Sequence, residues 1–201
     1  MTHAERRSLV PQFEERTGQG RKETDPYSKL FEERIVFLGA PVDDTSASDV
    51  TAQILALEDM DADRPIALYI NSPGGSITAM LAICDTMRYV RPEIETTCVG
   101  QAGSAAAILL AAGSPGRRQA LPSARILLHE PAIEGAGGAA TDLQIQAQEL
   151  LRLREQTEAI LAEATGHDPA TVRRDLDRER YFTAAEAKEY GLIDEVLASR
   201  H

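Results

Sequence analysis

Two short segments of the chain combine glycines with a serine in a pattern that could bind a negatively charged oxygen. Residues 70–76 read Ile-Asn-Ser-Pro-Gly-Gly-Ser, and residues 100–105 read Gly-Gln-Ala-Gly-Ser-Ala. Each segment lies between an apolar run typical of a strand and one typical of a helix, so N–H groups at a helix start and the hydroxyl of Ser104 are left free. This arrangement favours an oxyanion site. The first segment lacks the G-x-G-x-x-G spacing, and the chain contains no G-x-x-x-x-G-K-[ST], so a nucleotide phosphate site is not favoured.

One histidine is well placed to act with this serine. His129 ends the apolar run Ile-Leu-Leu at residues 126–128, whereas the other three histidines lie in the terminal tails or directly after Gly166. A strand would deliver His129 to the edge of a sheet beside Ser104, which would pair a nucleophile with a general base. The alternatives stay open at this point: Ser104 as a helix N-cap, and His129 as a strand-end histidine with a satisfied hydrogen bond.

Composition narrows the class of protein. The 201 residues suffice for one well-buried domain, and a net charge of −11 would repel a nucleic-acid backbone. Cys84 and Cys98 lie in apolar segments without C-x-x-C spacing, so neither a metal site nor a disulfide is expected. The N-terminus has no apolar leader segment, and the run at residues 105–112 is too short to span a membrane. We expect a cytoplasmic protein with no nucleic-acid or membrane partner.

The apolar periodicity predicts alternating strands and helices. Such alternation indicates an α/β fold with a mainly parallel sheet and with active groups at the carboxyl ends of strands. Asp43 and Ser46 supply caps for one helix, and the helix after Ser104 is apolar all round and therefore expected to be buried. The expected strands are residues 35–38, 66–70, 95–99 and 125–129. The expected helices are residues 27–34, 76–89, 104–112, 141–165 and 184–190, together with one after the caps at residues 43–46 that has Val50, Ile54 and Leu57 on one face.

Two segments lie outside this alternation, and the second is followed by an unusually long helix. Residues 1–26 have little periodicity and are expected to form a mobile arm or a removable leader, which leaves residues 27–201 as a single domain. The glycine-rich residues 133–140 are either an extended strand that approaches another backbone or a flexible linker. A capping box at Thr141 and Gln144 would open the helix at residues 141–165.

That helix is long enough to project from a domain of this size. It should therefore pack against another subunit. The apolar residues expected on this surface are Leu143, Leu150, Ile160 and Leu161.

Four motifs together resemble one family, the proteolytic subunit of the Clp protease, and their resemblance extends over about residues 27–196. The family has the crotonase-like (ClpP) fold, which implies an α/β domain of repeated β-β-α units with a projecting long helix. The matching segments are Tyr-Ile-Asn-Ser-Pro-Gly-Gly-Ser at 69–76, Gly-Gln-Ala-Gly-Ser at 100–104, Leu-Pro-x-Ala-Arg-Ile-Leu-Leu-His-x-Pro at 121–131, and Phe-Thr-Ala-x-Glu-Ala-x-Glu-Tyr-Gly-Leu-Ile-Asp at 182–194.

The resemblance implies a serine endopeptidase. Ser104 matches the nucleophile and His129 the general base, while Glu179 matches the acid that orients the histidine. The N–H groups of Gly75 and Ala105 match the oxyanion hole. The family degrades unfolded proteins to short peptides inside a chamber, and this subunit is expected to bind no cofactor.

The resemblance also implies an assembly. Family members form seven-membered rings that stack in pairs into a tetradecamer, and an AAA+ Clp unfoldase that uses ATP docks on the outer faces. Tyr69 and Tyr89 match the docking pocket for the unfoldase, while Asp177 and Arg178 match a pair that couples ring contacts to the active site. The long helix and the glycine-rich segment would form the contact between rings.

Three departures from the family pattern leave a second interpretation open. Glu179 stands where aspartate is usual, Gly103 where alanine is usual, and Glu130 where glutamine is usual. The chain could therefore be a weakly active or inactive paralogue that completes a mixed ring assembly. A third interpretation is an acyl-CoA enzyme of the same fold, which would need the oxyanion hole but not the pair of Ser104 and His129.

Overall fold

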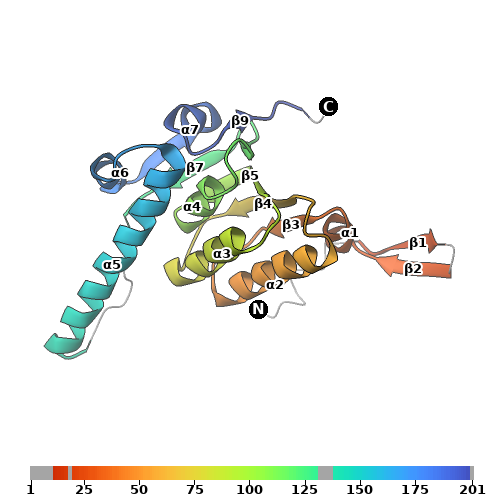
Figure 1. Ribbon diagram of the computed structural model, residues 1–201, viewed down its shortest axis with the longest axis horizontal. Helices are drawn as coiled ribbons and strands as arrows, with labels where there is room; N and C mark the ends of the chain where they lie inside the picture. The colour runs from red at the N-terminus through yellow and green to blue at the C-terminus, as the bar shows by residue number, and fades with distance from the viewer. Residues whose placement is uncertain (1–10, 18–19, 131–137, 200–201) are drawn as a thin grey trace.

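The protein is built around a seven-stranded sheet, shown in Figure 1. The computed structural model describes residues 11–17, 20–130 and 138–199. The strands of the main sheet are β3 (Ile35–Leu38), β4 (Ile66–Ser72), β5 (Ile94–Gly103), β6 (Arg118–Ala120), β7 (Arg125–Leu128), β8 (Arg180–Thr183) and β9 (Glu195–Val196). The helices are α1 (Pro26–Glu32), α2 (Asp44–Met60), α3 (Ile77–Tyr89), α4 (Ala105–Ala111), α5 (Ala140–Thr165), α6 (Pro169–Leu176) and α7 (Ala184–Tyr190).

The long strand β5 takes part in two portions of the sheet. Strands β3, β4, β5, β6 and β9 follow one another in that order, and all of these pairs are parallel. Residues 96–98 of β5 pair with β6, whereas residues 101–103 pair with β7. Strand β8 then adds to β7 in the antiparallel direction. The predicted α/β class with a mainly parallel sheet is confirmed, and the double use of β5 fits repeated β-β-α units.

Local capping signals set the start of several helices. Asp43 caps α2, as predicted, and the structure shows that it forms a capping box with Ser46. The hydroxyl of Ser76 accepts a hydrogen bond from an N–H of α3. The predicted capping box at Thr141 is wrong. Helix α5 begins at Ala140, its N-cap Ala139 makes no side-chain cap bond, and Thr141 is therefore already inside the first turn.

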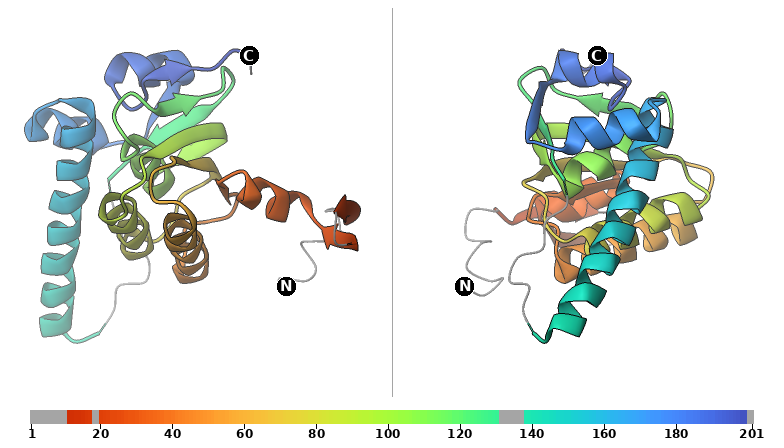
Figure 2. Two further views of the ribbon diagram at one scale, coloured as in Figure 1. Left: turned by 45° about the vertical axis from the view of Figure 1, so that its right-hand side comes forward. Right: turned by 90° about the vertical axis from the view of Figure 1, so that its left-hand side faces the viewer.

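The core is aliphatic, and α4 is its most enclosed helix. Every residue of α4 is buried, which confirms the prediction from its all-round apolar sequence. Helices α2 and α3 lie side by side on one side of the sheet (Figures 1 and 2). Their buried faces place Ile54, Leu57, Met80 and Ile83 in the same core. The turn between β5 and α4 is thus held on a rigid, closely packed support.

Helix α5 projects beyond the rest of the domain (Figures 1 and 2). Its 26 residues correspond to about 39 Å at the usual helical rise. Leu143, Ile145 and Leu151 on its outer half are 40%, 60% and 55% exposed. The expectation that Ile160 and Leu161 belong to this free surface is wrong, because both pack into the core of their own domain.

The residues before α1 form a separate pair of strands. Strands β1 (Phe13–Thr17) and β2 (Gly20–Thr24) form an antiparallel hairpin that extends away from the sheet in both figures. No strands were predicted there from the sequence. Most of the glycine-rich segment lies outside the described residues, which resume at Gly138. In the part of the chain that the structure describes, no helix is both long and apolar enough to cross a membrane.

Candidate active site

Ser104 occupies a strained turn between β5 and α4. Its φ of 50° and ψ of −118° are unusual for a residue with a side chain, and such a conformation costs about 1–3 kcal/mol. The N–H of Ser104 donates to the carbonyl of Leu127 on the neighbouring strand at 2.7 Å, which holds the turn in place. The hydroxyl makes no side-chain cap bond to α4. This conformation does not support the N-cap interpretation and presents the hydroxyl at a strand-to-helix turn, as in nucleophile elbows.

A second glycine turn packs directly on the Ser104 turn. A Cβ atom added to Gly74 would lie 2.3 Å from the carbonyl oxygen of Gly103 and 3.0 Å from Cβ of Ser104. Gly75 has a φ of 150°, and a Cβ there would lie 2.2 Å from the carbonyl oxygen of Val42. Only glycines allow the two backbones to approach this closely. The two glycine-bearing motifs found in the sequence therefore meet in space.

The predicted oxyanion donors lie at this junction. Ala105 is the first residue of α4, so its N–H has no acceptor within the helix. Gly75 lies opposite Val42 in a parallel bridge, whose hydrogen bonds are made by Gly74 and Ser76 on either side of it. The N–H of Gly75 itself donates to no described residue. Two free N–H groups beside a serine hydroxyl suit the negative oxygen of a tetrahedral intermediate.

His129 follows the last residue of β7 and is half-buried. Its Nδ1 lies 2.8 Å from the carbonyl oxygen of Glu130. Because a carbonyl only accepts hydrogen bonds, Nδ1 must carry the proton. In neutral His129, Nε2 is then left as the proton acceptor, which is the tautomer that a general base requires. Among the described residues, no hydrogen bond joins His129 to Ser104 or to Glu179.

Glu179 directly precedes the paired residues of β8 and His129 directly follows those of β7, although the Glu179 carboxylate has another partner. The antiparallel pair of β7 and β8 sets Leu127 opposite Tyr181 and Leu128 opposite Arg180. Extending this register by one residue sets His129 opposite Glu179, and side chains of such pairs are within reach of each other. Glu179 is exposed, and its Oε2 accepts a hydrogen bond from the hydroxyl of Tyr181 at 3.1 Å.

Asp175, another carboxylate near this segment, is fully engaged elsewhere. Its Oδ2 accepts a hydrogen bond from the hydroxyl of Tyr190 at 3.0 Å and pairs with Arg180 at 2.8 Å. Burial alone would raise the pKa of Asp175, but the bond from Tyr190 and the charge of Arg180 outweigh burial and lower that pKa. Burial and the same bond raise the pKa of Tyr190 to about 12. We therefore assign Asp175 a structural role as a charged carboxylate.

A chain of ion pairs, which the sequence analysis missed, runs from the residue after His129 into α5 and α6. Glu130 pairs with Arg154 at 2.5 Å, and Arg154 pairs with Glu158 at 2.8 Å. Two nitrogens of Arg173 bind the far side of Glu158, the shorter contact at 2.7 Å. Only the spacing of Arg154 and Glu158, four residues apart in a helix, could have indicated part of this chain.

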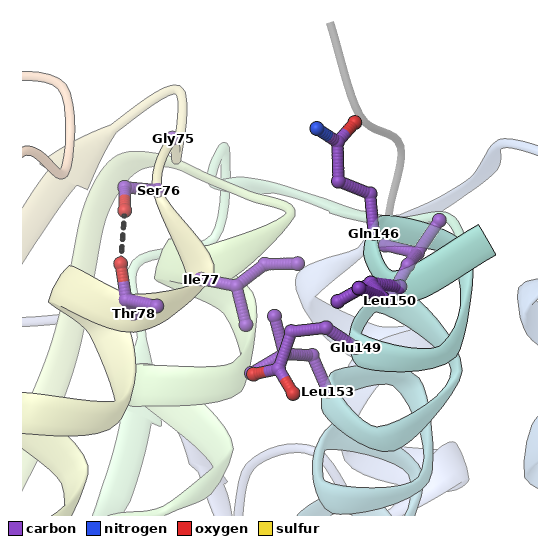
Figure 3. A pocket seen from close by; sticks show the side chains of 9 residues that line it. Gly75, Ser76, Ile77, Thr78, Gln146, Glu149, Leu150 and Leu153 are labelled. Atoms are coloured by element: carbon purple, nitrogen blue, oxygen red, sulfur yellow. Dashed lines mark hydrogen bonds between the residues drawn. The ribbon is translucent and has the colours of Figure 1, made fainter. Parts of the chain in front are cut away.

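An apolar pocket opens between the oxyanion turn and the projecting helix (Figure 3). Its volume is about 450 Å³. Ile77 points into it from α3, and Leu150 and Leu153 face it from α5. Gly75 lies on its wall. A side chain of an extended substrate could therefore enter this pocket while the neighbouring carbonyl lies at the free N–H groups.

The remaining residues singled out in the sequence lie away from this pocket. Tyr89 ends α3 and is 81% exposed, whereas Tyr69 is half-buried on β4. Asp177 and Arg178 are both exposed, with 3.6 Å between Oδ2 and Nε. Both side chains are therefore accessible at the surface of the single domain.

Comparisons with known proteins agree with this geometry. A family model described as Clp protease matches residues 18–200. The ATP-dependent Clp protease proteolytic subunit 1 of Rhodococcus jostii (strain RHA1) is 59% identical over 194 residues, which cover 96% of this chain and 88% of the relative. The subunit 2 proteins of Corynebacterium jeikeium (strain K411) and Streptomyces coelicolor are 56% and 55% identical. They cover 100% and 98% of this chain, and this chain covers 96% and 90% of them.

These matches span nearly the whole chain, including both glycine-bearing motifs and the segment with Glu179. They leave the acyl-CoA interpretation without support. The chain belongs to the Clp protease family.

Proposed function

We propose that this protein is a serine endopeptidase that forms the proteolytic subunit of an ATP-dependent Clp protease. The observation that carries the proposal is the strained Ser104 turn, which packs on the Gly74–Gly75 turn with two N–H groups left free. A buried helix start and two closely apposed backbones are costly to build for packing alone. They are well suited to acyl transfer at a serine.

The proposed reaction uses two proton transfers. Oγ of Ser104 bonds to the peptide carbonyl carbon while its proton passes to Nε2 of His129, and the N–H groups of Gly75 and Ala105 stabilise the resulting oxyanion. The C–N bond then breaks as His129 returns the proton to the leaving amine. Water next attacks the acyl ester, giving its proton to His129, and the serine oxygen leaves with that proton.

Glu179 is proposed as the acid that holds His129 and stabilises its charged form. The register of β7 and β8 supports this role, because its continuation by one residue beyond Leu128 and Arg180 would set Glu179 opposite His129. In the resting protomer the carbonyl of Glu130 already fixes the required tautomer. A carbonyl, however, has no full negative charge to stabilise an imidazolium. Glu179 should therefore contribute most when the proton has moved to His129.

We further propose that the subunit works within a cytoplasmic ring assembly. The exposed apolar half of α5 supports a contact with other subunits, because Leu143, Ile145 and Leu151 would otherwise face water. In this proposal seven-membered rings stack in pairs around a chamber that admits unfolded protein chains. An AAA+ Clp unfoldase would supply the ATP-driven step and dock at Tyr69 and Tyr89, while Asp177 and Arg178 would couple ring contacts to the active site.

A second candidate function is a weakly active subunit of a mixed assembly with a paralogue. The contact between Glu179 and Tyr181 favours it, since the acid does not engage His129 in the isolated protomer.

Hydrolysis of small fluorogenic peptides distinguishes the two candidates. The purified protein is assayed alone and mixed with a second Clp proteolytic subunit whose own nucleophile is replaced by alanine. Activity alone that disappears in Ser104→Ala supports the first candidate, and activity only in the mixture supports the second. Equal activity of the protein and Ser104→Ala in both settings would contradict the proposed nucleophile.

A further inference from the structure

The hydroxyl of Tyr181 is the only hydrogen-bond partner of the Glu179 carboxylate within the described residues. The two residues are separated by Arg180 and lie on the same side of the β8 segment, with 3.1 Å between the oxygens. The ring of Tyr181 is itself held, because the guanidinium of Arg125 on β7 lies 5.3 Å from its centroid. Arg125 is anchored in turn by Gln101 at 3.2 Å. The Tyr181 hydroxyl is thus presented to Glu179 by a supported side chain.

The contact also affects the ionisation of Tyr181. The hydrogen bond to Glu179 and the negative charge of that carboxylate raise the pKa of Tyr181. A phenol that donates to a carboxylate loses this bond when it ionises, so the contact favours the neutral phenol.

His129, like Glu179, already has a local hydrogen-bond partner. Nδ1 of His129 donates to the carbonyl of Glu130, whose side chain is tied to α5 through Arg154. For Glu179 to hold His129, the histidine must exchange that carbonyl for the carboxylate, and the carboxylate must leave Tyr181. Continued by one residue beyond the last pair, Leu128 with Arg180, the register would set the two groups opposite each other, while each has a local partner of its own.

We propose that Tyr181 is a positioning residue that holds Glu179 away from His129 and so limits the peptidase activity of the subunit. This inference rests on the proposed serine peptidase function. Tyr181 acts through Glu179 alone and touches no substrate. Any condition that moves Tyr181, such as contact of this exposed edge with a neighbouring subunit, would release the carboxylate to the histidine.

The test is a double-mutant cycle on the assembled protein. Tyr181→Phe removes the hydroxyl and keeps the ring on Arg125, and it is expected to raise kcat/KM for a fluorogenic peptide by about three- to tenfold, the worth of one ordinary hydrogen bond. The acid limb of the pH profile should also move to higher pH, because an engaged carboxylate stabilises the charged imidazolium. In a Glu179→Gln background, Tyr181→Phe should change neither quantity.

Tyr27→Phe is the matched control. Tyr27 is 49% exposed, close to the 51% of Tyr181, and its hydroxyl bonds to no described residue. Its removal should leave kcat/KM and the pH profile unchanged.

The outcomes separate the inference from the function on which it rests. An active protein that loses activity in Ser104→Ala but is unaffected by Tyr181→Phe overturns the positioning role and leaves the proposed function intact. The same holds if Tyr181→Phe has an equal effect with Glu179→Gln present. A protein whose peptide hydrolysis is the same in Ser104→Ala, alone and mixed with a second subunit, overturns both.

Discussion

Replacing Glu158 by glutamine should destabilise the protein measurably, because this carboxylate is buried between two arginines. Its side chain is 2% exposed, and it receives bonds from Arg154 at 2.8 Å and from Arg173 at 2.7 Å. Bonds to charged groups contribute about 1.5–3 kcal/mol each. In the variant, Arg173 can be hydrated because it is half exposed, and Arg154 still pairs with Glu130. We therefore expect Glu158→Gln to lower the free energy of unfolding by about 2 kcal/mol at neutral pH.

The effect should depend on pH in a defined direction. Burial alone would raise the pKa of Glu158, but the bonds from Arg173 and Arg154 outweigh it and lower that pKa. A carboxylate with a lowered pKa stabilises the fold above the ordinary glutamate value of about 4.3, and this contribution is lost as the pH falls through the folded value. The difference between the protein and Glu158→Gln should therefore shrink in acid.

Urea unfolding at matched protomer concentration measures this difference, since an assembly makes stability depend on concentration. Glu163→Gln is the control on the same helix: its carboxylate is 72% exposed and pairs with Arg88 on the surface. That variant should change stability by less than about 1 kcal/mol. A Glu158→Gln protein as stable as the control at neutral pH, or a difference that does not shrink in acid, would refute the reasoning.

Three other predictions concern the site and the assembly. Gly75→Ala should lower peptidase activity at least about 100-fold, because the added Cβ would lie 2.2 Å from the carbonyl oxygen of Val42 and displace an oxyanion donor. Gly116→Ala is the activity control, since Gly116 also has a positive φ but lies in open space. Glu179→Ala should lower kcat about 10- to 100-fold. This loss is smaller than the roughly 10⁴-fold loss known when a catalytic histidine takes the wrong tautomer, because the Glu130 carbonyl still holds His129 in the correct one. Leu151→Asp on the exposed half of α5 should yield smaller species by light scattering; an unchanged mass would contradict the assigned surface.

Much of the fold follows from local signals. The apolar periods around Ile54 and Met80, the cap at Asp43 and the all-round apolar helix after Ser104 are short-range patterns, and the structure bears them out. The sequence analysis missed β6, β8 and β9, which have only two to four residues each. Strands this short are too brief to show a period of their own, and they form because neighbouring strands offer partners.

Some features of the candidate site could likewise be predicted from the sequence, and others could not. The proximity of Ser104 to the Gly74–Gly75 turn could be predicted, because both lie at carboxyl ends of adjacent parallel strands. The contacts of Glu179 and Glu158 could not. The partner of Glu179 depends on which of two nearby donors reaches it, and the burial of Glu158 depends on Arg173, which lies on another helix. Tertiary contacts of this kind leave little trace in the local sequence.

The most direct test of the proposed activity is covalent labelling of Ser104. The assembled protein is treated with a serine-directed phosphonate, and the modified residue is identified by mass spectrometry of its peptides. We expect one adduct, on Ser104, formed far more slowly in His129→Ala and absent in Ser104→Ala. A protein that remains unlabelled, both alone and in a mixed assembly that hydrolyses peptides, would contradict the assignment of Ser104 as the nucleophile.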